Sequence, residues 1–164
     1  MIETIEFEGE KYPLFQTIGN SSQFALPYAK HLCVGTGYDI GYCKNDWKLE
    51  GAIGIDKNDD SPYDAYVLPE GTVDYIYSSH CLEHLKDWVG ALEIWVSHLS
   101  PGGVLFLYLP HKDQKYWKPW NNRKHLHSLD VDMVSECISK FGIKNIFWSE
   151  RDLNHSFIVV GEKE

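Results

Sequence analysis

Apolar residues along the chain recur with two spacings, one typical of buried strands and one typical of amphipathic helices. Short apolar runs bounded by polar or glycine-rich segments predict strands at 32–34, 52–55, 65–68, 73–79 and 104–109. The run 104–109 is continuously apolar, as in a parallel strand that is buried on both faces. Apolar residues three or four positions apart predict helices at 81–99 and 131–141.

The two ends of the chain have different patterns. Residues 2–12 alternate in part around Gly9, which predicts a β-ribbon, and 13–27 predicts a short helix covering the sheet or a ligand. Near the other end, apolar runs at 143–148 and 156–160 are joined by a short polar turn, so we expect antiparallel strands.

The order of these segments predicts an α/β fold with three α/β/α layers. We expect a Rossmann-like, doubly wound, mostly parallel sheet with a terminal antiparallel strand. Only seven residues separate Asp56 from Asp64, which is too few for a crossover helix, so the sheet is shortened. One domain spans 1–164, with an N-terminal cap segment at 1–29 and a Rossmann-like core at 30–161.

Composition excludes several classes of partner. The chain has 164 residues and a net charge of −9, and without an evident basic face nucleic acid is an unlikely substrate. Its four cysteines form no C-x-x-C pair, which indicates reduced thiols and a cytoplasmic protein. The acidic N-terminus has no apolar run typical of a signal peptide, and no window approaches the roughly 20 apolar residues that cross a bilayer.

A glycine turn follows the first predicted core strand. Gly35 and Gly37 flank Thr36, and two glycines at this spacing let the backbone bend sharply and approach a ligand closely. Asp56 follows 19 residues after Gly37, at the end of the second predicted strand. This is the layout of a βαβ nucleotide site, where the carboxylate accepts hydrogen bonds from ribose hydroxyls. The alternative is a simple turn with a solvated aspartate.

Four blocks of sequence, in order, resemble the class I S-adenosylmethionine-dependent methyltransferases, in a shortened form of the type 11-like, small-molecule group. They are Leu32-Cys33-Val34-Gly35-Thr36-Gly37, Gly54-Ile55-Asp56, Asp64-Ala65-Tyr66-Val67-Leu68-Pro69, and the segment 73–85 followed by Leu99-Ser100-Pro101-Gly102-Gly103. The resemblance implies S-adenosyl-L-methionine as the cofactor. It also implies that Asp64 contacts the adenine amino group.

The sequence departs from the family pattern at Cys33, where these enzymes usually carry an acidic residue that helps to hold the methionine amino group. Asp39 is the candidate to supply that carboxylate from the following loop. The predicted cofactor-binding residues are Gly35, Thr36, Gly37, Asp39, Asp56, Asp64, Ala65 and Ser79.

Two histidines are the candidate catalytic residues. Open α/β sheets bind ligands beyond the carboxyl ends of their strands, where His80 and His111 follow predicted strands. An imidazole titrates near neutral pH and can remove a proton from a methyl acceptor. Alternatively, His80 caps or packs beside the next helix. Glu83 and His84 are a mostly structural pair in the family that the chain resembles.

The irregular segment 110–128 is rich in aromatic residues, which commonly shape binding pockets. Tyr116, Trp117 and Trp120 are the predicted substrate-binding residues, although tryptophans also attach long loops to a surface. His111, His125 and His127 are of a type that binds metal ions, but the H-x-H spacing is common by chance, so no metal site is predicted.

We therefore expect methyl transfer from S-adenosylmethionine to an unidentified small-molecule acceptor. Cys33 and the short crossovers favour an alternative, a catalytically silent cofactor-binding subunit that supports a partner enzyme. A dinucleotide or nucleotide-sugar oxidoreductase is disfavoured because the chain has no G-x-G-x-x-G motif. The missing crossover helix leaves one sheet face under-covered, so either the N-terminal segment or a second copy in a homodimer covers it.

Overall fold

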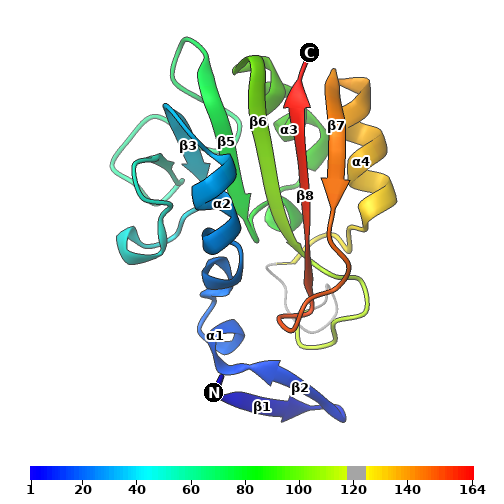
Figure 1. Cartoon of the computed structure of the whole chain (residues 1–164). Coiled ribbons are helices and arrows are strands. Elements are labelled where there is room, and N and C mark those ends of the chain that lie inside the picture. Colours follow the sequence, from blue (N-terminus) through cyan, green and yellow to red (C-terminus); the bar gives the residue numbers. More distant parts are fainter. Residues whose placement is uncertain (118–124) are drawn as a thin grey trace.

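A six-stranded sheet in the order β4–β3–β5–β6–β8–β7 forms the centre of the computed structural model, which describes residues 1–117 and 125–164 (Figure 1). Its strands are β3 (Gly37–Ile40), β4 (Ile53–Ile55), β5 (Val73–Ser79), β6 (Leu99–Pro110), β7 (Ile143–Trp148) and β8 (Ser156–Lys163). Neighbours from β4 to β6 pair in parallel, whereas β8 is antiparallel to both β6 and β7. The predicted mostly parallel sheet with a terminal antiparallel strand is confirmed.

Two helices, α3 (Trp88–Ser97) and α4 (Val131–Lys140), cover the rear face of the sheet in Figure 1. Each begins at an aspartate whose carboxylate accepts a hydrogen bond from a backbone amide, Asp87 from Gly90 and Asp130 from Met133. The helix predicted over 81–99 is therefore shorter. A separate turn of 3-10 helix, η3 (Leu82–His84), precedes it, because Leu85 is extended and Asp87 starts a new helix.

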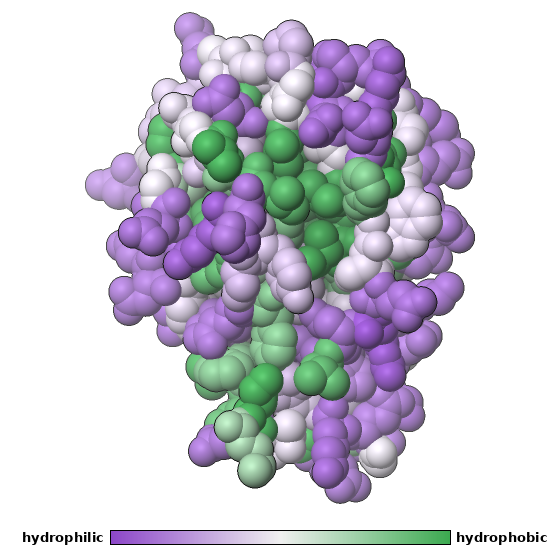
Figure 2. Space-filling view, in the orientation of Figure 1, coloured by the Kyte–Doolittle hydropathy of each residue, from purple (hydrophilic) through white to green (hydrophobic). Residues whose placement is uncertain are grey.

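The front face of the sheet is covered mainly by α2 (Leu26–Leu32) (Figure 1). Buried aromatic residues of β5 and β6 pack in the same core cluster as Ala25 and Ala29, which carry the helix onto the sheet. Beyond α2, side chains beside β8 remain exposed: Phe147 by 69%, Trp148 by 60% and Leu153 by 76%. Figure 2 shows apolar surface gathered on this face. The expectation of an under-covered face therefore agrees with the structure.

The N-terminal segment lies beyond the carboxyl ends of the parallel strands (Figure 1). It contains β1 (Thr4–Phe7), β2 (Glu10–Pro13), α1 (Leu14–Thr17) and η1 (Ser21–Phe24). The predicted ribbon is confirmed, since β1 and β2 pair antiparallel around Gly9. Tyr12 attaches it to the core by stacking on His155 with ring centroids 4.1 Å apart and by accepting a hydrogen bond from the Lys115 amide.

The strand predicted at 32–34 is wrong. The helix α2 runs through Leu32, Cys33 caps it, and the first strand of the sheet is β3. The Gly35–Gly37 turn therefore precedes this strand rather than following it. A Cβ on Gly35 would lie 2.3 Å from an oxygen of Asp74, whose carboxylate accepts a hydrogen bond from the Thr36 amide at 2.8 Å. These glycines serve a close approach between neighbouring chain segments.

The strand predicted at 65–68 is also wrong. Asp64 and Val67 form an isolated bridge, and the Asp64 carboxylate accepts hydrogen bonds from the amides of Tyr66 and Val67 at 2.7 and 3.0 Å. An aspartate that bonds the backbone two residues onward makes a turn. Between β3 and β4, η2 (Asn45–Trp47) is a single short turn, as the poor helix pattern there predicts. None of the described helices is long and apolar enough to cross a bilayer.

Candidate active site

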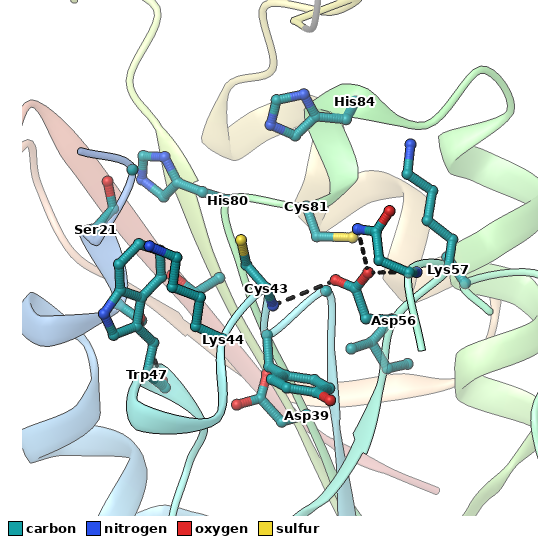
Figure 3. Close-up of a pocket in the computed structure, with 18 of the residues that line it drawn as sticks. Ser21, Asp39, Cys43, Lys44, Trp47, Asp56, Lys57, His80, Cys81 and His84 are labelled. Carbon is teal, nitrogen blue, oxygen red and sulfur yellow. Dashed lines mark hydrogen bonds between the residues drawn. The ribbon is translucent and has the colours of Figure 1, made fainter. Parts of the chain in front are cut away.

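The carboxyl ends of β3, β4 and β5 lie side by side, because Ile40 pairs with both Ile55 and Ser78. A pocket of about 800 Å³ opens beyond them (Figure 3). Its size suits a small-molecule or cofactor site, for which roughly 300–1,000 Å³ is usual. The N-terminal segment contributes Thr17, Ile18 and Ser21 to its wall.

The glycine that matters in this pocket is Gly41, the first residue after β3. Its φ is +80°, and a Cβ there would lie 2.5 Å from the sulfur of Cys81. Its amide donates to the Ile55 carbonyl at 2.7 Å, which joins the turn to the end of β4. Only glycine fits this conformation and space without strain. The pocket's glycine turn thus follows a later strand than the one predicted.

Asp56 lines the pocket at the end of β4, where the sequence placed it. One carboxylate oxygen accepts a hydrogen bond from the Cys43 amide at 3.2 Å, and the other accepts two from Asn58, at 2.9 and 2.7 Å (Figure 3). These contacts fix a carboxylate at the mouth of the Gly41 turn, where it can accept further hydrogen bonds from a ligand.

Asp39 is the buried acid of the site, on β3, with 1% of its surface exposed. Its Oδ2 accepts a hydrogen bond from the Leu49 amide at 2.7 Å, while Oδ1 has no hydrogen-bond partner among the described residues. Burial raises the pKa of this carboxyl to about 7, against the opposing effects of the Leu49 hydrogen bond and the charge of Lys48.

The departure from the family pattern that we expected at Cys33 came from placing the first strand of the sheet too early in the chain. Cys33 caps α2, and burial, with the nearby Asp39, raises the pKa of its thiol to about 12. The acidic residue on the first strand of the sheet is Asp39 itself. Cys33 is therefore no reason to doubt cofactor binding.

The remaining predicted cofactor residues divide into two groups. Ala65 and Ser79 line the pocket together with Asp39 and Asp56. The pocket lining does not include Gly35, Thr36, Gly37 or Asp64. Gly35 and Thr36 precede β3, Gly37 begins it, and Asp64 uses its carboxylate in its own turn.

The structure places only one of the two candidate catalytic histidines in the pocket wall. His80 lines it directly after β5, with a left-handed φ of +49°, and its Nε2 lies 2.9 Å from the Ser156 hydroxyl. Burial holds its pKa well below the ordinary value, so the ring is neutral at pH 7. His111 lies outside the pocket lining, with its ring centroid 6.1 Å from that of Phe157, so the expected catalytic role does not fit its position.

Sequence reasoning missed a cluster beside His80. Glu83 is fully buried, and its Oε1 lies 3.6 Å from His84 Nε2 and 3.9 Å from His125 Nε2. Burial raises the pKa of Glu83 and, with His84 nearby, lowers that of His125 to about 3. The Glu-His dipeptide after β5 was a usable signal, but 42 positions separate Glu83 from His125.

The predicted aromatic wall is partly present. Trp117 lines the pocket, stacks on His125 with centroids 6.0 Å apart, and donates from Nε1 to the Gln16 carbonyl at 3.3 Å. Tyr116 instead packs on Phe7, with ring centroids 5.3 Å apart, and helps to attach the N-terminal ribbon. Trp120 lies outside the described residues.

Comparisons with known proteins identify the family to which the chain belongs. A family model described as a methyltransferase domain matches residues 19–153. Among curated proteins, none matches the chain.

Solved structures share the fold at low sequence identity. A SAM-dependent methyltransferase of Thermotoga maritima, a possible histamine N-methyltransferase, is 15% identical with a TM-score of 0.71 over 92% of this chain and 93% of that one. The 1,6-didemethyltoxoflavin-N1-methyltransferase of Burkholderia thailandensis is 12% identical with a TM-score of 0.68, over 90% and 80% of the two chains. The N-methyltransferase NodS of Bradyrhizobium japonicum is 15% identical with a TM-score of 0.63, over 92% and 88%.

The family match spans most of the chain, and the structural likeness extends over nearly all of it. The chain therefore belongs to the methyltransferase domain family, as a class I methyltransferase whose methyl donor is S-adenosylmethionine.

Proposed function

We propose that this enzyme methylates a small-molecule acceptor bound in the pocket beside the cofactor. The observation that carries the proposal is that one pocket joins the Gly41–Asp56 edge to a second wall built from His80, His84 and Trp117. One structural neighbour is by name an N-methyltransferase of a small molecule, and another is described as a possible histamine N-methyltransferase, which supports an acceptor of this class.

The residues on the first side fit the cofactor. The Asp56 carboxylate suits the ribose hydroxyls, and the bare backbone at Gly41 allows a close approach. The unpaired oxygen of Asp39, among the described residues, suits the methionine amino group. Ala65 and Ser79 complete this side. When bound, the cofactor supplies an electrophilic methyl group, so the protein's task is to position the acceptor.

The residues on the second side suit the acceptor. Trp117 offers an apolar plane, and Thr17 and Ile18 of the N-terminal segment close the pocket over it. His80 is the catalytic residue that we assign, because it lies directly after β5 at the junction of the two sides. Positioning an acceptor against a bound donor accounts for much of the barrier lowering in such transfers.

The test is labelled methyl transfer from S-adenosylmethionine into fractions of a metabolite extract, with S-adenosylhomocysteine binding measured on the same protein. Label in a small-molecule fraction supports the proposal. Binding without transfer into any fraction would contradict it and favour the alternative, a silent cofactor-binding subunit. The short crossovers remain as support for that alternative.

We also propose a cytoplasmic homodimer. The four cysteines are all free thiols, which supports a reducing compartment. The exposed Phe147, Trp148 and Leu153 give a second copy an apolar surface beside β8. Sedimentation should show a dimer at micromolar concentration that Trp148→Ser dissociates, and a monomeric wild-type protein would contradict the proposal.

A further inference from the structure

The cluster of Glu83, His84 and His125 lies outside the residues that we assign to the cofactor, and its composition is that of a metal site. One ligand atom from each of the three side chains lies within 4.8 Å of the other two. His84 and His125 also line the pocket. Figure 3 shows His84 on the same side of it as His80. An ion held between them would therefore border the space that we assign to the acceptor.

The buried carboxyl group of Glu83 needs a partner. Its side chain is fully buried, and among the described residues neither carboxylate oxygen has a hydrogen-bond partner. A buried carboxyl group without hydrogen bonds is costly, and buried charges in proteins are normally paired or coordinate a metal. The three nearby histidine nitrogens stand 3.6 to 3.9 Å from Oε1, which is beyond hydrogen-bond length.

These separations suit a shared ion better than direct hydrogen bonds. Two ligands bound at about 2.1 Å to a tetrahedral ion stand roughly 3.4 Å apart. Glu83 Oε1 lies 3.6 Å from His84 Nε2 and 3.9 Å from His125 Nε2, so small movements bring the three atoms to coordination distance.

The backbone holds the two ligand segments together. The amides of Leu126 and His127 both donate to the Glu83 carbonyl, at 2.8 and 3.2 Å, and the His127 ring bonds the Leu85 carbonyl at 2.8 Å. Trp117 stacks on His125 and limits the positions of its ring. Fixed ligands on a rigid support are a property of built metal sites rather than of chance clusters.

We propose that Glu83, His84 and His125 bind a Zn²⁺-type divalent cation at the acceptor end of the pocket. Two imidazoles and one carboxylate suit zinc and related transition metals, whereas Mg²⁺ favours oxygen ligands alone. Three protein ligands leave a coordination position open, as in catalytic rather than structural zinc sites. That position borders the pocket. If the proposed function holds, the ion therefore favours methyl acceptors that can bind it through an oxygen or nitrogen atom.

The test measures metal binding directly and needs no methyl acceptor. Chelator-treated protein is titrated with Zn²⁺ by calorimetry, and Co²⁺ is added to record its visible absorption. We expect one ion per chain, a cobalt spectrum of a nitrogen- and oxygen-ligated site, and no saturable binding of Mg²⁺. Zn²⁺ should also raise the melting temperature, because a ligand that binds only the folded state stabilises it.

Variants test whether Zn²⁺ binds at this cluster and not elsewhere on the protein. Glu83→Gln, which keeps the shape of the side chain, and His84→Ala should each weaken Zn²⁺ binding by about tenfold or more. The matched control Glu93→Gln, on the exposed face of α3, should bind as the wild type does. Absence of a bound ion in the wild type, or wild-type Zn²⁺ affinity in both cluster variants, would overturn the proposal. Circular dichroism confirms that each variant is folded, and His84→Ala decides if Glu83→Gln is not.

Discussion

The Asp56 carboxylate lies 3.2 Å from the backbone nitrogen of Cys43, so the end of β4 holds the turn that follows β3. The same side chain accepts two hydrogen bonds from Asn58, which ties the next loop to the same point. One carboxylate thus organises two loops of the pocket and still faces the space between them (Figure 3). Cofactor binding should therefore depend strongly on this residue.

Replacing Asp56 with alanine should weaken S-adenosylhomocysteine binding by roughly 1–3 kcal/mol, because hydroxyl groups and the Cys43 amide lose their acceptor. Calorimetry with the purified variant measures the change. Asp60→Ala is the matched control, since Asp60 is exposed in the loop after Asn58 and does not line the pocket. If both variants bind with wild-type affinity, the ribose does not lie at Asp56.

Substituting Gly41 with alanine should destabilise the fold by more than its conformational strain alone. Gly51 has a similar φ of +83° against +80°, but nothing lies within 4 Å of a Cβ there, whereas a Cβ on Gly41 meets Cys81. Left-handed backbone costs about 1–2 kcal/mol for alanine, and overpacking adds roughly 1–3 kcal/mol. The losses in free energy of unfolding of Gly41→Ala and Gly51→Ala, measured with urea, should therefore differ by roughly 1–3 kcal/mol. Equal losses would show that Cys81 moves aside freely.

The buried carboxyl of Asp39 should make stability depend on pH. Its pKa is raised from 3.8 to about 7 in the folded state, so the folded protein binds a proton more tightly than the unfolded chain. Stability from this group is thus lost as pH rises from about 4 through 7, by an amount on the order of a few kcal/mol. Burial lowers the pKa values of His80 and His125, which acts in the opposite direction over the same pH range. The Asp39 contribution is therefore measured by urea unfolding without cofactor at pH 5 and pH 8, as the difference between the wild type and a variant that cannot ionise at this position.

The variant Asp39→Asn isolates this contribution, because an amide oxygen still accepts the Leu49 hydrogen bond but does not ionise. Between pH 5 and pH 8, the free energy of unfolding of the wild type should fall relative to that of the variant. Asp60→Asn, at an exposed position, should leave the wild-type pH dependence intact. An unchanged pH dependence in Asp39→Asn would mean that Asp39 is ionised in the folded protein.

His80 and His111 should differ in their effect on turnover. His80→Asn should lower kcat by about tenfold or more while S-adenosylhomocysteine affinity stays near the wild-type value, because we assign this pocket-lining histidine to the acceptor. Asparagine is chosen because it tolerates the left-handed backbone at this position. His111→Asn is the control, outside the pocket lining. Full activity of both variants with the acceptor found by labelling would remove His80 from the mechanism.

Elements with an unambiguous hydrophobic pattern could be predicted from the sequence. The helix predicted at 131–141 ends one residue earlier in α4, and the apolar run 104–109 lies within β6, although β6 begins five residues before it. The position of the glycine turn could not be fixed in this way. Leu32-Cys33-Val34-Gly35 and Tyr38-Asp39-Ile40-Gly41 both resemble a strand ending at a glycine. Only the packing identifies the second segment as the strand. Its glycine, Gly41, lies against Cys81, in the connection that follows β5.

The candidate site followed the same division. Asp56 could be predicted because strand, carboxylate and turn are contiguous in the sequence. The pairing of Glu83 with His125 depends on backbone hydrogen bonds from Leu126 and His127 to the Glu83 carbonyl, which no local pattern encodes. By spacing alone, His111, His125 and His127 form one group of candidate metal ligands. Of these three, the structure places His125 in the cluster with Glu83.

The strand β8 occupies an inner position of the sheet, between β6 and β7, although it is formed by residues 156–163. During synthesis, β7 is made before it and has nothing to pair with until these residues leave the ribosome. The nascent chain therefore leaves one edge of β6 unpaired until residues 156–163 emerge, and deleting these residues would leave β6 and β7 without the neighbour that they share. Pulse-labelled proteolysis of stalled chains would find the protein sensitive to cleavage until this insertion is complete.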